Sequence, residues 1–139
     1  SPIIGGGNDG QTALLAACFL GHPNMVIELL KAGANPHIVD YLMKATPCHK
    51  GAYAGHPNVV NNLVEHSQVE VNAQGPYNGY SALHDATWHG HTEVVKVLLE
   101  ANVCMTLQGH DGKTPLELAV EFGYKEIENL IREKMKLLQ

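Results

Sequence analysis

The sequence is poor in several residue types that would mark particular classes of protein. Its 139 residues contain only three cysteines, Cys18, Cys48 and Cys104, an odd number without the spacing of a metal site. We therefore expect reduced thiols and a cytoplasmic protein, with the nucleus as the alternative compartment. Basic residues are also few, because nine Lys and Arg stand against 14 Asp and Glu. The resulting net charge of −5 argues against a nucleic-acid partner, which would need a basic stripe.

Long apolar runs and catalytic motifs are missing as well. No stretch approaches the ~18 to 20 apolar residues of a membrane-spanning helix, and no charged-then-apolar leader opens the sequence. We expect no membrane insertion. The sequence contains no nucleophile elbow, no phosphate-binding loop and no HExxH motif. These absences predict a protein that is not an enzyme, with no catalytic residue and no cofactor.

What the sequence does contain is a fourfold internal repeat. A glycine followed by His or Tyr recurs at Gly21, Gly55, Gly90 and Gly123, with spacings of 34, 35 and 33 residues. A period of this length is typical of a stacked array, in which each unit buries its apolar face against its neighbour. We predict a single domain over residues 1–139 with a flexible N-terminus at 1–8. The repeats are expected at about 9–40, 41–75, 76–108 and 109–139.

Each repeat carries the signals of two short helices. A Thr or Ser stands before the first helix as a candidate N-cap, at Thr12, Thr46, Ser81 and Thr114. The repeated glycines should end these first helices in the left-handed conformation. The first helices are therefore predicted near 13–20, 47–54, 82–89 and 115–122. In each second helix, aliphatic residues such as Met25, Val59 and Val94 recur at helical spacing, so we expect them to be buried.

Together these motifs resemble the ankyrin repeat, whose pattern is a β-turn finger ending in D-G-x-T-P-L-H, a short helix, G-H and a second helix. Thr46, Pro47 and His49 match the T-P-L-H part in the second copy, and Thr114 and Pro115 match its start in the fourth. The second finger departs from the pattern, because Lys44 stands where the family has Gly. The resemblance implies an all-α solenoid of four helix–turn–helix units with β-turn or hairpin fingers. It also implies that the protein binds other proteins.

Nine histidines invite a metal-site hypothesis, which the repeat pattern weakens. Five of them lie in the G-H turn or the T-P-L-H position, where we expect hydrogen bonds between repeats: His22, His49, His56, His84 and His91. The remaining four are scattered over different elements, and no acidic or cysteine partner lies at ligand spacing. We therefore expect no metal site.

The eight aromatic residues favour one surface. The resemblance implies that the two residues before the G-H glycine, together with the finger residues, face a concave groove. Six of the eight aromatic residues occupy such positions, which favours a groove for a protein or peptide partner over rings that merely pack between first helices. The predicted partner-binding residues are Phe19, Leu20, Leu42, Met43, Tyr53, Tyr77, Asn78, Tyr80, Trp88, His89, His110, Lys113 and Phe122.

Two further hypotheses accompany this prediction. The first repeat has Leu14 and Leu15 but no polar capping helix before it, which favours a targeting or regulatory segment of a larger enzyme, effector or channel. In addition, the sequence Glu70-Val71-Asn72-Ala73 is similar to the finger sequence that an asparaginyl hydroxylase modifies in ankyrin proteins, so Asn72 is a candidate hydroxylation site. Ordinary finger geometry is the other explanation of that sequence. We expect the protein to be a monomer.

Overall fold

The computed structural model describes residues 9–40 and 44–138. These residues form eight helices and, within those ranges, no strand. The helices come in four pairs: α1 (Asp9–Leu20) with α2 (Pro23–Lys31), α3 (Pro47–Ala54) with α4 (Pro57–His66), α5 (Ala82–Trp88) with α6 (Thr92–Glu100), and α7 (Pro115–Phe122) with α8 (Lys125–Leu137).

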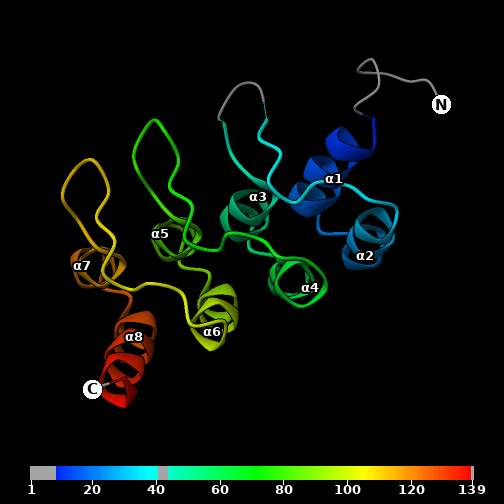
Figure 1. Cartoon of the computed structure of the whole chain (residues 1–139). Helices are drawn as coiled ribbons and strands as arrows, with labels where there is room; N and C mark the ends of the chain where they lie inside the picture. Colours follow the sequence, from blue (N-terminus) through cyan, green and yellow to red (C-terminus); the bar gives the residue numbers. More distant parts are fainter. Residues whose placement is uncertain (1–8, 41–43, 139) are drawn as a thin grey trace.

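The four pairs stack in chain order (Figure 1). The first helices α1, α3, α5 and α7 form one row, and the second helices α2, α4, α6 and α8 form another. Each helix packs against its counterpart in the next pair, and α1 and α8 lie at opposite ends of the stack. The loops before α5 and α7 project on the same side. This arrangement confirms the predicted all-α solenoid of four helix–turn–helix units.

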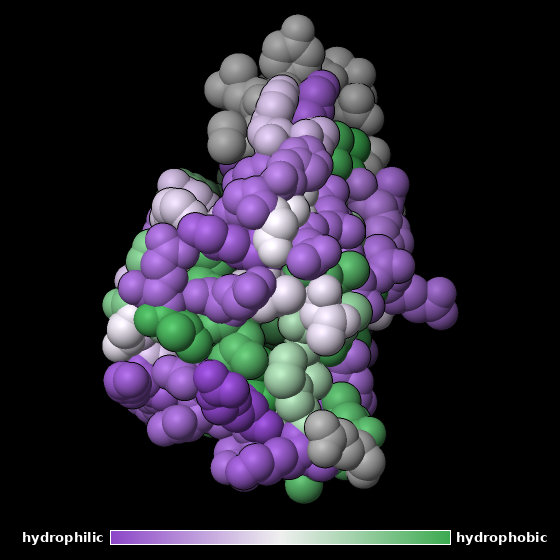
Figure 2. Space-filling view, turned by 90° about the vertical axis from the view of Figure 1, so that its left-hand side faces the viewer, coloured by the Kyte–Doolittle hydropathy of each residue, from purple (hydrophilic) through white to green (hydrophobic). Residues whose placement is uncertain are grey.

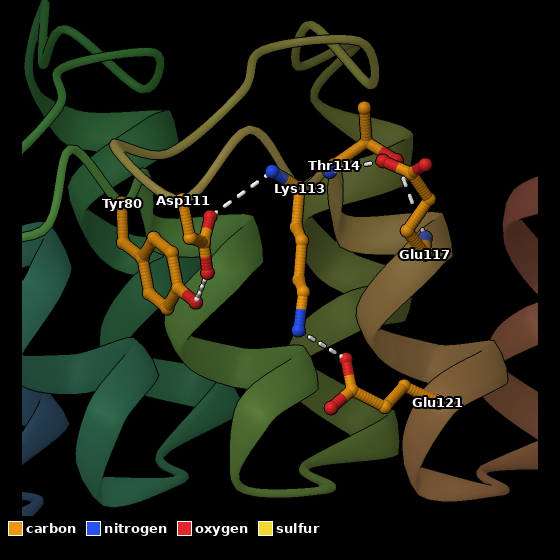
Figure 3. A network of polar contacts seen from close by, with 6 residues as sticks. All are labelled: Tyr80, Asp111, Lys113, Thr114, Glu117 and Glu121. Carbon is orange, nitrogen blue, oxygen red and sulfur yellow. Dashed lines mark hydrogen bonds and ion pairs between the residues drawn. The ribbon is translucent and has the colours of Figure 1, made fainter.

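The predicted caps are present in the last three repeats. Side-chain oxygens of Thr46, Ser81 and Thr114 accept the backbone N–H of the residue three positions later. In the fourth repeat Glu117 also accepts the Thr114 N–H at 2.9 Å, which closes a capping box (Figure 3). Lys44 has a φ of 54°, so it adopts the left-handed conformation of the Gly that it replaces.

The first helix begins earlier than predicted. α1 starts at Asp9 and not near residue 13, so Thr12 lies inside the helix instead of at its N-cap. The residues that follow explain the difference. Ala13 stands where the second and fourth repeats have a proline, which would force the preceding residue into an extended conformation. Leu15 occupies the position in the first repeat that His84 has in the third. The His84 side chain accepts the Ser81 backbone N–H and so completes the cap of α5, whereas Leu15 has no polar group for this role.

The core lies between the two rows of helices and runs along the whole stack. Its largest fully buried side chains are Leu14, Leu63, Leu83, Leu98, Leu118, Ile127 and Ile131. The aliphatic stripes of the second helices face this core, with one exception to the prediction. Met25 is 51% exposed, because no described helix lies on the N-terminal side of α2. Val59 and Val94 occupy the same position in α4 and α6, which pack against a preceding helix, and both are buried.

Histidine rings join successive repeats, as predicted. Four Nε2 atoms donate to backbone carbonyls one repeat away at 2.9 to 3.0 Å, in the pairs His49–Tyr80, His56–Phe19, His84–Lys113 and His91–Tyr53. Burial lowers the pKa of His49 and His84, which keeps these rings neutral. His22 differs, because it makes no such bond within the described part of the chain.

Candidate functional site

A groove lies between the loop that leads into α5 and the first helices. It consists of two adjoining clefts of about 330 and 320 Å³, which share Tyr53, Asn78, Tyr80 and Asp85. The first cleft is completed by Phe19, Ala45, His49, Lys50, Gly75 and Tyr77. The second is completed by Trp88 and His89. We call these residues the groove. They come from the first, second and third repeats, so only the stacked array assembles them.

Five of the predicted aromatic anchors are exposed. The exposed fractions are 45% for Phe19, 50% for Tyr53, 64% for Tyr77, 44% for Trp88 and 37% for Phe122. The rings also contact one another from repeat to repeat, since the centroids of Trp88 and Phe122 lie 5.0 Å apart, edge to face. Figure 2 shows the end of the stack at α7 and α8, where apolar side chains also reach the surface in patches bordered by polar ones.

Tyr80 differs from the prediction, because its side chain is only 5% exposed. Its ring stacks on His84 at 4.7 Å between centroids and packs against the backbone at Gly109. Its hydroxyl donates to the Asp111 carboxylate at 2.7 Å (Figure 3). Burial, together with this carboxylate, raises the pKa of Tyr80. Tyr80 therefore forms a wall of the groove and joins the third and fourth fingers, and it is not an exposed anchor.

The remaining predicted residues divide into two sets. Asn78 and His89 are exposed and line the groove. Leu20, His110 and Lys113 line neither cleft, although Leu20 is 61% exposed.

The polar members of the second set make contacts within the array. The His110 ring bonds to the Tyr77 carbonyl at 3.1 Å, and the Lys113 ammonium pairs with Glu121 (Figure 3). Leu42 and Met43 lie outside the described residues.

Five groove residues are not among the predicted binding residues: Ala45, His49, Lys50, Gly75 and Asp85. For two of them a signal was available. Lys50 stands three positions before Tyr53, and Asp85 three before Trp88. Residues three apart share one face of a helix, so the face predicted to carry the anchors necessarily carries these charges as well.

The two charged groove residues have different surroundings. The Lys50 ammonium lies 3.0 Å from the Asp40 carboxylate and 5.5 Å from the centre of the Phe19 ring. The Asp85 carboxylate has no hydrogen bond or ion pair within residues 9–40 and 44–138. Burial raises the pKa of Asp85 to about 7, with no cation to offset it. At neutral pH this group therefore changes its charge readily.

The candidate hydroxylation site Asn72 lies outside the groove. Its side-chain oxygen accepts the backbone N–H of Cys104 at 2.8 Å, so the amide links the second repeat to the third.

The three cysteines are free thiols, and burial raises the pKa of Cys18 and Cys48 to about 12. Among the residues that the structure describes, His, Cys, Asp and Glu nowhere gather in a group of three that could hold a metal ion.

No helix in the described part of the chain has both the length and the apolar character that a membrane crossing requires.

The sequence is similar to parts of several larger proteins. It is 33% identical to the tyrosine-protein kinase HTK16 of Hydra vulgaris, over 86% of this chain and 16% of that protein. It is 31% identical to the palmitoyltransferase ZDHHC17 of Danio rerio, over 82% of this chain and 24% of that protein.

A third relative is the human transient receptor potential cation channel subfamily A member 1, with 33% identity over 89% of this chain and 11% of the channel. The chain thus spans less than a quarter of the length of each of these relatives. A family model described as ankyrin repeats in three copies matches residues 33–109 and 49–137, and one for a single ankyrin repeat matches residues 9–41. With the stacked helix pairs described above, these matches show that the chain belongs to the ankyrin repeat family.

Proposed function

We propose that this chain is a non-enzymatic interaction module that holds a peptide or folded protein partner in the groove. Ankyrin repeats are protein-interaction modules and are typically non-catalytic. The observation that carries the proposal is the set of exposed rings that line the groove: Phe19, Tyr53, Tyr77 and Trp88. Phe122 is exposed beside Trp88 but lies outside the two clefts. Trp and Tyr are enriched among the residues that contribute most to binding energy at protein interfaces.

The energetics favour this use of the rings. Fully burying a large apolar side chain contributes roughly 1.5 to 3 kcal/mol, and these rings, which are about half exposed, have roughly half of that left to gain before the costs of ordering are subtracted. Three or four such rings would supply roughly 2 to 6 kcal/mol towards the free energy of a micromolar complex, about −8 kcal/mol. The groove volumes lie near the lower end of the range for small-ligand sites, about 300 Å³, which suits side chains inserted from a peptide.

A displayed peptide library tests the proposal. Peptides would be selected on the wild-type domain and then compared on a Tyr53→Ala, Trp88→Ala double variant. Leu137→Ala is the control, because it removes an apolar side chain that is 78% exposed but lies in α8. We expect binding to be lost only in the double variant, and the single tryptophan should shift its emission to the blue when a peptide binds. Peptides that bind all three proteins equally would contradict a site in this groove.

A second candidate function is a targeting or regulatory segment of a larger enzyme, effector or channel. The observation that favours it is that the chain matches only 11 to 24% of a kinase, a palmitoyltransferase and a channel. An antibody raised against α8 and used on extracts of the source cells would test it. A band far above 15.0 kDa supports the larger protein, and a band at that mass argues against it.

We further propose that the isolated domain is a monomer that does not bind nucleic acid and acts in the cytoplasm. Its net charge of −5 supports the absence of nucleic-acid binding, because phosphate backbones are bound by basic surfaces. Sedimentation equilibrium would test the monomeric state, for which we expect a mass near 15.0 kDa. A concentration-dependent mass near twice that value would contradict it.

A further inference from the structure

The least explained group in the groove is the Asp85 carboxylate. Asp85 lies on α5, borders both clefts and has no hydrogen bond or ion pair of its side chain within the described residues. A carboxylate withdrawn from water is costly unless a cation or hydrogen-bond donor compensates it. The residues that the structure describes supply no such group, so the ionised form of Asp85 is disfavoured in the free protein. A ligand that provides the missing charge would recover this energy.

The surroundings of Asp85 suit a cation. Tyr53 and Trp88 line the second cleft together with Asp85, and both expose about half of their side chains. Aromatic faces attract ammonium and guanidinium groups, and the attraction grows as water is excluded. The one ammonium lining the first cleft, that of Lys50, is held 3.0 Å from Asp40. The titratable and charged groups that border Asp85 on the neighbouring elements are Cys48, His49, Lys50, Tyr80 and His89.

We propose that the groove receives one positively charged side chain, lysine or arginine, from the partner, and that its cation pairs with Asp85 between the rings of Tyr53 and Trp88. The inference rests on the proposed function, because it specifies which kind of peptide the groove takes. A charge-assisted hydrogen bond in a partly dehydrated site is stronger than a neutral one. The ligand is therefore a largely apolar peptide with a basic residue at one fixed position.

A coupling to pH follows from the burial of Asp85. Burial raises the pKa of Asp85 to about 7, whereas a bound cation favours the ionised carboxylate. Below pH 7 the peptide must displace a proton in order to bind. We therefore expect affinity for a basic peptide to fall by up to about tenfold per pH unit below 7. His89 also borders the cleft, and burial together with His91 lowers its pKa, so its ring gains charge only in more acidic solution.

The test is a peptide library whose central residue is fixed as Arg, Lys, norleucine or Glu. It is selected at pH 8 on four proteins: the wild-type domain, Asp85→Asn, Glu121→Gln, and the Tyr53→Ala, Trp88→Ala double variant. Glu121→Gln is the matched control, because Glu121 lies on α7 in the same row of first helices but is already paired with Lys113. We expect Arg and Lys peptides to be enriched on the wild-type and Glu121→Gln proteins. Their affinity should fall at least about tenfold on Asp85→Asn.

Three other results would overturn the proposal. Norleucine peptides that bind as well as Arg peptides, and lose binding only in the double variant, would overturn the cation pocket and leave the aromatic groove intact. A basic preference that survives Asp85→Asn would also overturn it, because the charge recognised would then lie elsewhere. If no peptide depends on Tyr53 and Trp88, the proposed groove fails together with this inference.

Discussion

At the scale of single residues, the turn glycines are constrained by backbone conformation and by the next repeat. Gly55 has a φ of +81°, and a Cβ placed on it would lie 2.7 Å from the ring of His91. Gly123 has a similar φ of +74°, but such a Cβ would meet nothing within 4 Å. The two positions therefore separate the cost of left-handed backbone from the cost of displacing the histidine.

We predict that Gly55→Ala destabilises the domain by about 2 to 4 kcal/mol, and Gly123→Ala by only about 1 kcal/mol. Both substitutions place a Cβ in the left-handed region, but only the first also moves the ring that bonds to the Tyr53 carbonyl. Urea unfolding monitored by circular dichroism measures both values. Equal losses of unfolding free energy in the two variants would show that the His91 ring can move aside at no cost in stability.

Asp85 gives a second prediction at this scale. Its pKa rises from 3.8 to about 7 on folding, so the folded protein holds a proton that the unfolded chain releases. Stability from this residue is fully present below pH 3.8 and is lost as the pH rises towards 7. Asp85→Asn should therefore be more stable than the wild type at pH 8, by about 1 to 4 kcal/mol, and the two should converge near pH 4.

The measurement is the free energy of unfolding at pH 4, 6 and 8. Glu100→Gln is a suitable control, because Glu100 is an exposed residue at the end of α6. Its substitution should leave the difference between the three pH values unchanged. An Asp85→Asn variant that is less stable than the wild type at pH 8 would mean that the carboxylate has a stabilising partner in the fold.

At the scale of the helices, the sequence predicted which faces are buried better than where helices begin. Leu98 belongs to an aliphatic stripe at helical spacing and is fully buried. The start of α1 was predicted wrongly, because a Thr serves as a cap only when the residues after it favour that geometry. The burial of Tyr80 was also missed, since it depends on Gly109 and Asp111 in the next finger. Contacts across repeats are not visible in the pattern of one repeat.

Truncating Leu98, which is buried, should cost far more stability than truncating Trp88, which is exposed. Leu98→Ala should cost about 2 to 5 kcal/mol, because it leaves a cavity between α6 and the neighbouring helices. Trp88→Ala should cost only about 1 kcal/mol, because 44% of the side chain is already in water. Chemical denaturation of the two variants decides the matter. If Trp88→Ala costs as much as Leu98→Ala, Trp88 is a core residue and the groove loses its central anchor.

At the scale of the whole molecule, the repeat register located the binding face but not its electrostatics. Aligning the four copies placed Phe19, Tyr53 and Trp88 in equivalent positions, and the structure exposes all three. The same alignment could not show that Lys50 is paired with Asp40 while Asp85 has no partner among the described residues. Lys50 and Asp85 occupy the same position of the second and third repeats with opposite charges. Pairing depends on how side chains of adjacent repeats meet in space, which the alignment does not show.

Coupling along the array supplies the last prediction. In a stacked repeat protein, cooperativity comes from the interfaces between neighbours. If one interface is weakened, the repeats on its two sides can therefore unfold separately. His91 bonds to the Tyr53 carbonyl at 3.0 Å across such an interface, whereas His22, at the same position of the first repeat, makes no such bond within the described residues. Both residues precede a second helix without capping it through their side chains. His22→Ala therefore controls for every local effect of the substitution.

We expect His91→Ala to lower the free energy of unfolding by about 1 to 2 kcal/mol and His22→Ala to change it by less than about 0.5 kcal/mol. The urea transition of His91→Ala should also broaden, with a smaller m value, because the first two repeats can then unfold separately from the last two. The Trp88 emission reports the third repeat and circular dichroism reports the whole chain, so the two curves should separate only in this variant. Coincident curves with an unchanged m value would show that apolar packing alone couples the repeats.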